Sequence, residues 1–368
     1  MKIPFLDLQA GYLEIKEEVD AAVARVLQSG RYVQGAEVED FETEFATYCS
    51  SKYAITVANG LDAIHLTLRA LEIGPGDEVI VPSNTFIATW LAVSHCGATV
   101  VPVEPDLRTY NIEAETIERA ITAKTKAIIP VHLYGTPANI GAINNLANGR
   151  GIRVIEDAAQ AHGARYKGER IGAHSDCVAW SFYPGKNLGA LGDGGAVTTD
   201  DLNLANRLRA LRNYGSSEKY VHEIVGFNSR LDPIQAAVLR VKLKVLDDWN
   251  GRRRKLAAFY LSGLSDAELV LPEIPSWVEP VWHIFPVRTK NRDKLRSDLL
   301  QQGIETLIHY PIPPHRQNAY RSAKIAAHQF PAAEEIASTI LSLPIGPQMR
   351  HEEAETVIKA VRMACDLA

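Results

Sequence analysis

The chain has 368 residues and a formal net charge of −5, with 46% hydrophobic and 23% charged residues. This length allows about two domains with a large core, and the composition is ordinary for a globular protein. The negative charge offers no attraction for nucleic acid or an anionic membrane, and no apolar run approaches the length of a membrane span.

The four cysteines lie far apart and form no CxxC pair, which argues against a zinc site or a disulfide framework. A reducing cytoplasm suits such a chain, and the first residues lack the long apolar core of a signal peptide. We therefore expect a cytoplasmic protein with no metal, nucleic-acid or membrane partner.

The first half of the chain alternates between helical and strand patterns. Apolar residues recur at helical spacing over residues 13–27, where Ser29 and Gly30 end the helix, and again from Phe41 to Tyr48. Strands and helices then alternate, which is typical of a mostly parallel, doubly wound sheet. We expect strands at residues 53–57, 78–81, 99–103, 127–131, 153–156, 177–182 and 194–199, and helices that open at residue 58 or span 88–93, 112–121 and 140–147.

After Val197 the pattern changes. We expect helices over residues 202–211 and 233–246, a break, and a continuation through 255–264. A strand at 282–288, a helix at 292–302, a strand at 303–309 and helices near 332–342 and 352–364 then predict a small α+β domain. The boundary is expected near Trp249, which divides the chain into residues 1–249 and 250–368.

The stretch SFYPGKNLGALGDGGA, residues 181–196, holds a single lysine, Lys186, among aromatic, glycine and small apolar residues. Both flanks have the pattern of buried strands, so Lys186 lies on a tight connection. A lysine in a partly dry site can lose its proton and attack a carbonyl group. A lysine on a surface loop is the alternative, and this stretch alone does not decide between them.

Asp157 closes the apolar strand that begins at Arg153. A carboxylate at that end of a strand points into the crevice where open α/β sheets bind ligands, although a helix cap or an ion-pair partner is the other interpretation. A lysine and a carboxylate that each close a strand are the pair that pyridoxal phosphate requires. The lysine forms a Schiff base, and the carboxylate holds a proton on the pyridine nitrogen.

Two further positions fit a cofactor site. Asn59, Gly60 and Leu61 follow a strand and open a helix, whose free N–H groups attract a phosphate, although every α/β fold contains several such turns. Phe86 stands at the start of another helix, where an aromatic residue is either core or a platform for a ligand ring.

Three long motifs occur in a fixed order: EDAAQAHGA at residues 156–164, SFYPGKNLGALGDGGA at 181–196 and GFNSRLDPIQAA at 226–237. With PFLDL at 4–8 and LSLPIGPQM at 341–349, they make the chain resemble the DegT/DnrJ/EryC/StrS sugar aminotransferases over almost its whole length. The resemblance implies the α/β fold of type I pyridoxal-phosphate enzymes, which is that of aspartate aminotransferase. Such enzymes have a large domain with a mostly parallel, seven-stranded sheet and a small C-terminal α+β domain.

The resemblance also implies roles for residues around pyridoxal 5'-phosphate. Lys186 would bind the cofactor and shuttle a proton, Asp157 would face the pyridine nitrogen, and Gln160 would lie near the phenolic oxygen. Phe86 would lie over the ring. The phosphate would be bound by the amides of Gly60 and Leu61, by Ser181 and by Asn228. In the family this asparagine comes from the neighbouring subunit, which predicts an obligate homodimer with two shared sites.

On the substrate side the resemblance brings four residues toward the sugar: Tyr183, His309, Tyr310 and His315. A single histidine is more often structural, so only Tyr183 and His309 are favoured as contacts to the sugar. Arg31, Asn187 and the pair Tyr320-Arg321 are unranked candidates for the nucleotide diphosphate.

Two features of the motif at Lys186 narrow the choice among the reactions of the family. The deoxygenating branch of the family carries histidine at this position, so Lys186 favours transamination. Members that act at C4 usually read SFHxxKxITTGEGG, whereas this chain resembles enzymes that aminate C3. We expect transfer of the amino group of L-glutamate to C3 of a dTDP-3-oxo-6-deoxyhexose.

Alternative functions remain open. A UDP-linked 3-oxo sugar, or amination at C4, is the nearest alternative reaction. A pyridoxal-phosphate-binding sensor without turnover is an alternative of another class, against which Lys186, Asp157 and Gln160 argue. A dinucleotide-dependent oxidoreductase is disfavoured because no GxGxxG motif follows the first strands.

Overall fold

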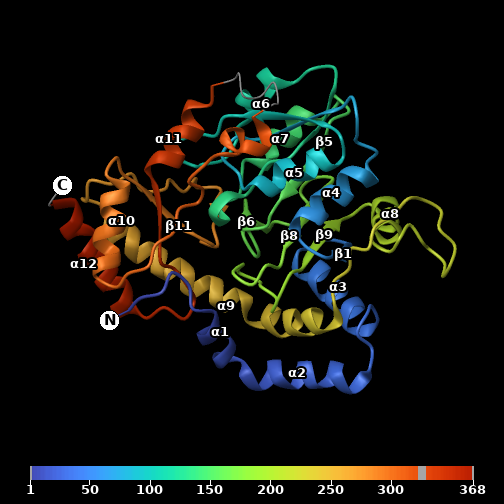
Figure 1. Ribbon diagram of the computed structural model, residues 1–368, viewed down its shortest axis with the longest axis horizontal. Coiled ribbons are helices and arrows are strands. Elements are labelled where there is room, and N and C mark those ends of the chain that lie inside the picture. The colour runs from blue at the N-terminus through green and yellow to red at the C-terminus, as the bar shows by residue number, and fades with distance from the viewer. Residues whose placement is uncertain (1, 322–328, 367–368) are drawn as a thin grey trace.

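The computed structural model describes residues 2–321 and 329–366 (Figure 1). Its centre is a seven-stranded sheet in the order β1-β9-β8-β5-β4-β2-β3. The strand β9 runs antiparallel to both of its neighbours, and the other pairs are parallel. This confirms the predicted mostly parallel sheet. The strands are β1 (Tyr53–Val57), β2 (Glu78–Pro82), β3 (Thr99–Val103), β4 (Thr125–Ile128), β5 (Arg153–Asp157), β8 (Cys177–Ser181) and β9 (Gly195–Thr199).

Helices cover both faces of the sheet because alternate strand residues point to opposite sides. In β2, Val79 and Val81 belong to one apolar cluster and Ile80 to the other. The first cluster includes residues of α4 (Gly60–Ala70), α5 (Ile87–His95) and α8 (Leu202–Arg212). The second includes residues of α3 (Ala36–Tyr48), α6 (Ala114–Ala120), α7 (Ile140–Ala147) and the first half of α9 (Pro233–Gly263).

Two N-terminal helices precede this unit, α1 (Leu8–Glu14) and α2 (Lys16–Ser29). The predicted end at Gly30 is confirmed: this glycine has φ of 65°, a left-handed conformation that suits a residue without a side chain. Val19 and Ala22 of α2 pack against α9, and α2 lies below α9 at the lower edge of Figure 1.

A third apolar cluster forms the C-terminal unit. It contains the antiparallel pair β11 (Phe285–Arg288) and β12 (Ile340–Leu343), with α10 (Arg292–Gln301), α12 (His351–Asp366) and the second half of α9. Ile3 belongs to this cluster too, and its amide donates to the carbonyl of Gly303 at 2.9 Å. The division into residues 1–249 and 250–368 stays a prediction.

The predicted break in α9 is wrong. One helix of 31 residues runs through Trp249 and Gly251. Two buried polar side chains hold it there: Asn250 donates to the carbonyl of His162 at 2.8 Å, and Arg253 donates to the carbonyls of Trp282 and Ile345. These tertiary contacts outweigh the low helix propensity of the glycine.

Two elements of the C-terminal unit also differ from the prediction. The expected strand over residues 303–309 has only isolated bridges, from Ile304 to Ile3 and from Leu307 to Ser342. The helix expected near 332–342 ends earlier, as α11 (Pro331–Thr339), and β12 follows directly. Residues 340–343, ILSL, pair with β11 instead of continuing the helix. The remaining short elements are η1 (Leu133–Gly135), β6 (Arg165–Tyr166), β7 (Glu169–Arg170), β10 (Val278–Glu279), η2 (Pro314–Arg316) and η3 (Asn318–Tyr320).

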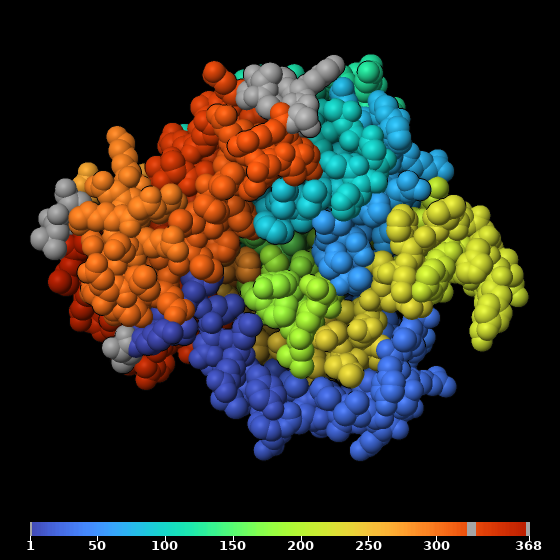
Figure 2. All heavy atoms as spheres, in the orientation of Figure 1, coloured from blue at the N-terminus to red at the C-terminus, as the bar shows by residue number. Residues whose placement is uncertain are grey.

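Residues 214–227 form an arm between α8 and α9 that projects from the body of the protein (Figures 1 and 2). Tyr220 and Val225 on this arm are each 83% exposed. Within the described residues, no helix is long and apolar enough to cross a membrane.

Candidate active site

The strands β1, β5 and β8 run in the same direction, so their carboxyl ends meet at one edge of the sheet. A cavity of about 840 Å³ opens there. Asn59, which follows β1, Asp157 at the end of β5 and Ser181 at the end of β8 all line it. Open α/β sheets bind ligands at this edge.

Lys186 lies on the connection between β8 and β9 and lines the cavity. The loop is a compact turn: the Lys186 amide donates to the carbonyl of Tyr183, and the Ala190 amide donates to that of Phe182, both at 2.8 Å. Gly189 is required, because a Cβ atom there would lie 2.3 Å from the carbonyl oxygen of Pro184. The prediction of a tight connection is confirmed.

Burial lowers the pKa of Lys186 to about 8, although the negative charge of Asp157 opposes the change. A substantial fraction of the amine is therefore neutral near physiological pH. Only the neutral amine can attack an aldehyde.

We accordingly expect the capture of pyridoxal phosphate by the cofactor-free protein to accelerate as the pH rises through about 8. Stopped-flow absorbance between pH 6.5 and 10 would measure this profile, with free lysine as the control. A midpoint near the ordinary lysine value of about 10.4 would contradict the expectation.

Asp157 is buried, with 7% of its surface exposed. Its Oδ2 accepts from the Thr89 hydroxyl at 2.9 Å and its Oδ1 from the Ala159 amide at 3.2 Å. Burial raises the pKa of this carboxyl group, while these two hydrogen bonds and the charge of Lys186 work in the opposite direction. The two donors thus oppose the effect of burial and hold the carboxyl group in one orientation.

We expect Thr89→Val to lower kcat about tenfold, because it removes one charge-assisted hydrogen bond from Asp157 at nearly constant volume. Thr89→Ser keeps the hydroxyl and is the matched control. Steady-state kinetics of the two variants would test this, and equal loss in both would show that Thr89 acts through packing.

The first turn of α4 offers a second polar wall. The Asn59 side chain accepts from the Asp62 amide at 2.8 Å, and the Ala63 amide donates to the carbonyl of Asn59. The amides of Gly60 and Leu61 precede the first residue with an acceptor inside the helix, so they are free to bind an anion. Gly60 is required here, because a Cβ atom would lie 2.6 Å from Cβ of Ser181.

Aromatic and polar groups also line the cavity. Gln160 accepts from the Tyr134 amide at 2.6 Å and donates to the Tyr310 hydroxyl at 3.0 Å. Phe86 is 53% exposed and lines the cavity, with its ring 5.3 Å from that of Tyr310. Phe86 is therefore not a core residue, and its position suits a platform for a ligand ring.

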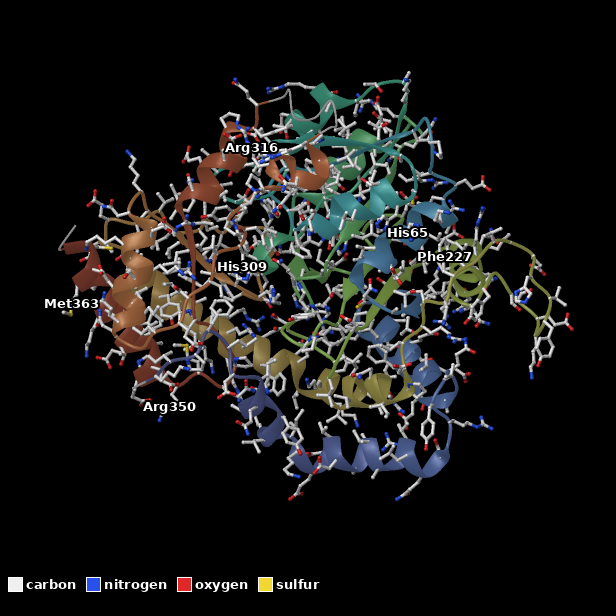
Figure 3. The ribbon with its side chains drawn as sticks, in the orientation of Figure 1. His65, Phe227, His309, Arg316, Arg350 and Met363 are labelled. Atoms are coloured by element: carbon white, nitrogen blue, oxygen red, sulfur yellow. The ribbon has the colours of Figure 1, made fainter. Side chains whose placement is uncertain are left out.

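His309 also lines the cavity, between the sheet and the C-terminal unit (Figure 3). Its Nδ1 lies 2.8 Å from the hydroxyl of Ser342. Burial and the charge of Lys186 lower the pKa of His309 to about 4. This imidazole is therefore neutral at physiological pH and can accept or donate one hydrogen bond toward a substrate.

The structure brings ten of the twelve predicted residues together around this cavity. They are Gly60, Leu61, Phe86, Asp157, Gln160, Ser181, Tyr183, Lys186, His309 and Tyr310. Asn228 does not line it; it is exposed at the base of the arm, where it forms a bridge with Asn213. His315 is also outside it: the side chain is 3% exposed, lies 3.1 Å from a carboxylate oxygen of Glu334 and packs on Phe330.

None of the candidates for binding the nucleotide diphosphate lines the cavity. Asn187 cannot contact a ligand, because it is buried and donates to Asn250 at 2.8 Å and to the carbonyl of Val281 at 2.9 Å. Tyr320 is 7% exposed and packs on Trp90 beneath α5. Arg31 and Arg321 are exposed, and neither lines the cavity.

Several residues of the cavity were missed from the sequence. Thr89 is a polar residue in an otherwise apolar helical turn, which is a usable signal. His283 lies 3.2 Å from Oδ1 of Asn187, which accepts because Nδ2 of the same amide makes two donor bonds. No local pattern identifies His283. The apolar wall formed by Phe5, Leu6 and Leu8 was predicted only as a family motif.

These groups match the three polar parts of pyridoxal phosphate. An amine of lowered pKa suits the aldehyde, a buried carboxylate suits the ring nitrogen, and a helix N-terminus with Ser181 suits the phosphate. Fold and site together define a fold-type-I, pyridoxal-phosphate-dependent aminotransferase. The chain belongs to the DegT/DnrJ/EryC1/StrS aminotransferase family, whose model matches residues 13–362.

Several similar proteins match this chain over nearly its full length. The chain is 57% identical to dTDP-3-amino-3,4,6-trideoxy-alpha-D-glucose transaminase of Streptomyces venezuelae, over 98% of this chain and 96% of the relative. It is 54% identical to erythromycin biosynthesis sensory transduction protein EryC1 of Saccharopolyspora erythraea, over 98% of this chain and 99% of the relative. It is also 54% identical to dTDP-3-amino-3,6-dideoxy-alpha-D-galactopyranose transaminase of Aneurinibacillus thermoaerophilus, over 98% of each chain.

Two solved structures support the same class. The crystal structure of S. venezuelae DesV in complex with a ketimine intermediate has a TM-score of 0.98 and 56% identity, covering 99% of each chain. NtdA from Bacillus subtilis, solved with bound cofactor PMP, has a TM-score of 0.91 and 33% identity, covering 99% of this chain and 85% of that one.

Proposed function

We propose that this enzyme transfers the amino group of L-glutamate to C3 of a dTDP-3-oxo-6-deoxyhexose, giving a dTDP-3-amino-3,6-dideoxyhexose and 2-oxoglutarate. One observation carries the proposal: the relatives at 57% and 54% identity that are named as transaminases both act on dTDP-linked 3-amino sugars. The intact Lys186 and Asp157 at one cavity support it, because they are the groups that transamination requires.

In the proposed reaction pyridoxal phosphate, when bound, supplies an aldehyde that carries the amino group and a ring that withdraws electrons. Nζ of Lys186 holds the cofactor between turnovers. Once an amino donor has released it, the neutral Nζ removes the proton from the donor's α-carbon, and in the second half-reaction it delivers a proton to C3 of the sugar. Asp157, oriented by Thr89 and Ala159, would lie at the ring nitrogen and favour a positive charge there.

The remaining side chains have positioning roles in the proposal. Gly60, Leu61 and Ser181 bind the phosphate, and Phe86 covers the ring. Gln160 lies near the phenolic oxygen. Tyr183, His309 and Tyr310, which line the same cavity, would contact the sugar. His315 has no role in binding the sugar, because Glu334 and Phe330 enclose it.

A homodimer with shared sites is part of the same proposal. Asn228 is exposed and does not line the cavity of its own chain, and the adjoining arm carries exposed apolar side chains such as Tyr220 and Val225. An arm of this kind suits a second copy of the chain, to whose phosphate site it would bring Asn228. A cytoplasmic location is proposed too, because four scattered cysteines suit a reducing compartment.

The test is turnover with L-glutamate and a panel of nucleotide-linked 3-oxo and 4-oxo sugars on dTDP and UDP carriers. We expect amination of the dTDP-linked 3-oxo sugar, with 2-oxoglutarate formed in equal amount. Amination of 4-oxo sugars alone would overturn the assignment to C3. Preference for UDP-linked sugars would overturn the assignment of dTDP as the carrier.

A sensor without turnover is the second candidate, because one relative at 54% identity bears a sensory-transduction name. A sensor and an enzyme would both bind the cofactor at Lys186. Only the enzyme would release 2-oxoglutarate stoichiometrically from L-glutamate in a single turnover, so this measurement separates the two.

A further inference from the structure

Ser229 immediately follows the arm and lies against the first turn of α4. Its side chain is buried, with 2% of the residue exposed. The hydroxyl accepts from the Ala58 amide at 3.0 Å and donates to Oδ2 of Asp62 at 2.6 Å. One hydroxyl group therefore connects residues on both sides of Gly60 and Leu61, the two amides that face the cavity.

Two side chains bridge the turn between Ala58 and Asp62. The Asn59 side chain closes it from within, at 2.8 Å from the Asp62 amide. Ser229 closes it from outside by donating to the carboxylate of Asp62, which lines the cavity near the proposed phosphate site. Because like charges repel, the orientation of that carboxylate matters for anion binding. The Ser229 hydroxyl holds it in a fixed direction.

The segment that carries Ser229 is itself anchored on α4. The ring of Phe227 lies 5.0 Å from that of His65, in an edge-to-face arrangement (Figure 3). The Phe227 amide also donates to the carbonyl of Leu211 at 2.7 Å, and the Ser229 amide donates to that of Arg212 at 2.9 Å. Ser229 is thus presented by a rigid base, although the arm before it projects from the body.

We propose that Ser229 is a positioning residue for the cofactor's phosphate: it fixes the first turn of α4 in the conformation that binds the anion. The inference rests on the proposed phosphate site at Gly60 and Leu61, and it adds a residue that does not itself touch the cofactor. Ordered donors bind an anion more tightly because less freedom is lost on binding.

The experiment compares pyridoxal phosphate with pyridoxal, which lacks the phosphate. Each is titrated into the full-length protein after its cofactor has been removed, and binding is followed by absorbance. We expect Ser229→Ala to weaken pyridoxal phosphate binding about tenfold and to leave pyridoxal binding unchanged. Ser338→Ala, the same substitution on α11, is the control and should change neither affinity, since the Ser338 hydroxyl bonds only to the carbonyl of Glu335 among the contacts described.

Asp62→Ala tests the other end of the bridge and covers the case in which Ser229→Ala does not fold. Charge alone predicts tighter pyridoxal phosphate binding, since a negative group is removed, whereas loss of the bridge predicts weaker binding. Tighter binding of pyridoxal phosphate by Asp62→Ala would overturn the role of Ser229. Equal weakening of both ligands by Ser229→Ala would overturn it too. If the unaltered protein itself failed to prefer pyridoxal phosphate over pyridoxal, the proposed phosphate site would be wrong as well.

Discussion

Lys186→Ala is expected to lower transamination by at least about 10⁴-fold, because it removes both the amine that holds the cofactor and the group that moves the proton. The absorbance band of the covalently held cofactor should disappear, while noncovalent binding should remain through Gly60, Leu61 and Ser181. Kinetics and an absorbance spectrum of the purified variant would measure the two effects.

Two variants control this result. Lys186→Arg keeps the positive charge but not an amine that can lose its proton, so it should be as inactive as Lys186→Ala. Lys126→Ala removes an exposed lysine on β4 and should retain full activity. Substantial turnover in Lys186→Arg would show that charge, and not proton transfer, is what position 186 provides.

Asp157→Asn is expected to lower kcat by about 10²–10⁴-fold, because the uncharged amide no longer stabilises a proton on the ring nitrogen. Folding should be little affected, since the amide oxygen can still accept from the Ala159 amide and the amide nitrogen can donate to the Thr89 hydroxyl. The variant should also lower the pKa of Lys186 further, because the carboxylate that favours its charged form is lost. A pH–rate profile of cofactor capture would show this second effect.

Asp176→Asn is the matched control. Asp176 precedes β8, whereas Asp157 ends β5, and it pairs with Arg153 and accepts from the Val154 amide. We expect this substitution to reduce stability and to leave kcat unchanged. Comparable losses of kcat in both variants would contradict a specific electrostatic role for Asp157.

The large sheet could be predicted from the sequence because its strands are short apolar runs separated by glycine and by amphipathic helices. Residues 53–57 and 99–103 match β1 and β3 without adjustment. Where the prediction failed, tertiary contacts decided. Gly251 suggests a helix break, and the buried bonds of Asn250 and Arg253 prevent it. The run at 340–343 continues a helical pattern, yet it pairs with β11.

Some residues of the site could likewise be predicted from the sequence, and others could not. Asp157, Ser181 and Lys186 were predictable because each stands at or just after the end of a strand, so local sequence places it at the edge of the sheet. Thr89, His283 and Leu6 come from three other segments, and only the packing of those segments brings them to the cavity. Asn187 shows the converse: it adjoins Lys186 in sequence, but the turn directs its amide into the interior.

The length of α9 restricts how this enzyme can open and close. The helix contributes to the cluster beneath the large sheet at one end and to the C-terminal cluster at the other, without a flexible linker between them. Swinging one unit relative to the other would require bending a continuous rod and breaking backbone hydrogen bonds around Gly251. We therefore expect a bulky nucleotide-linked sugar to be admitted by smaller motions of the cavity rim.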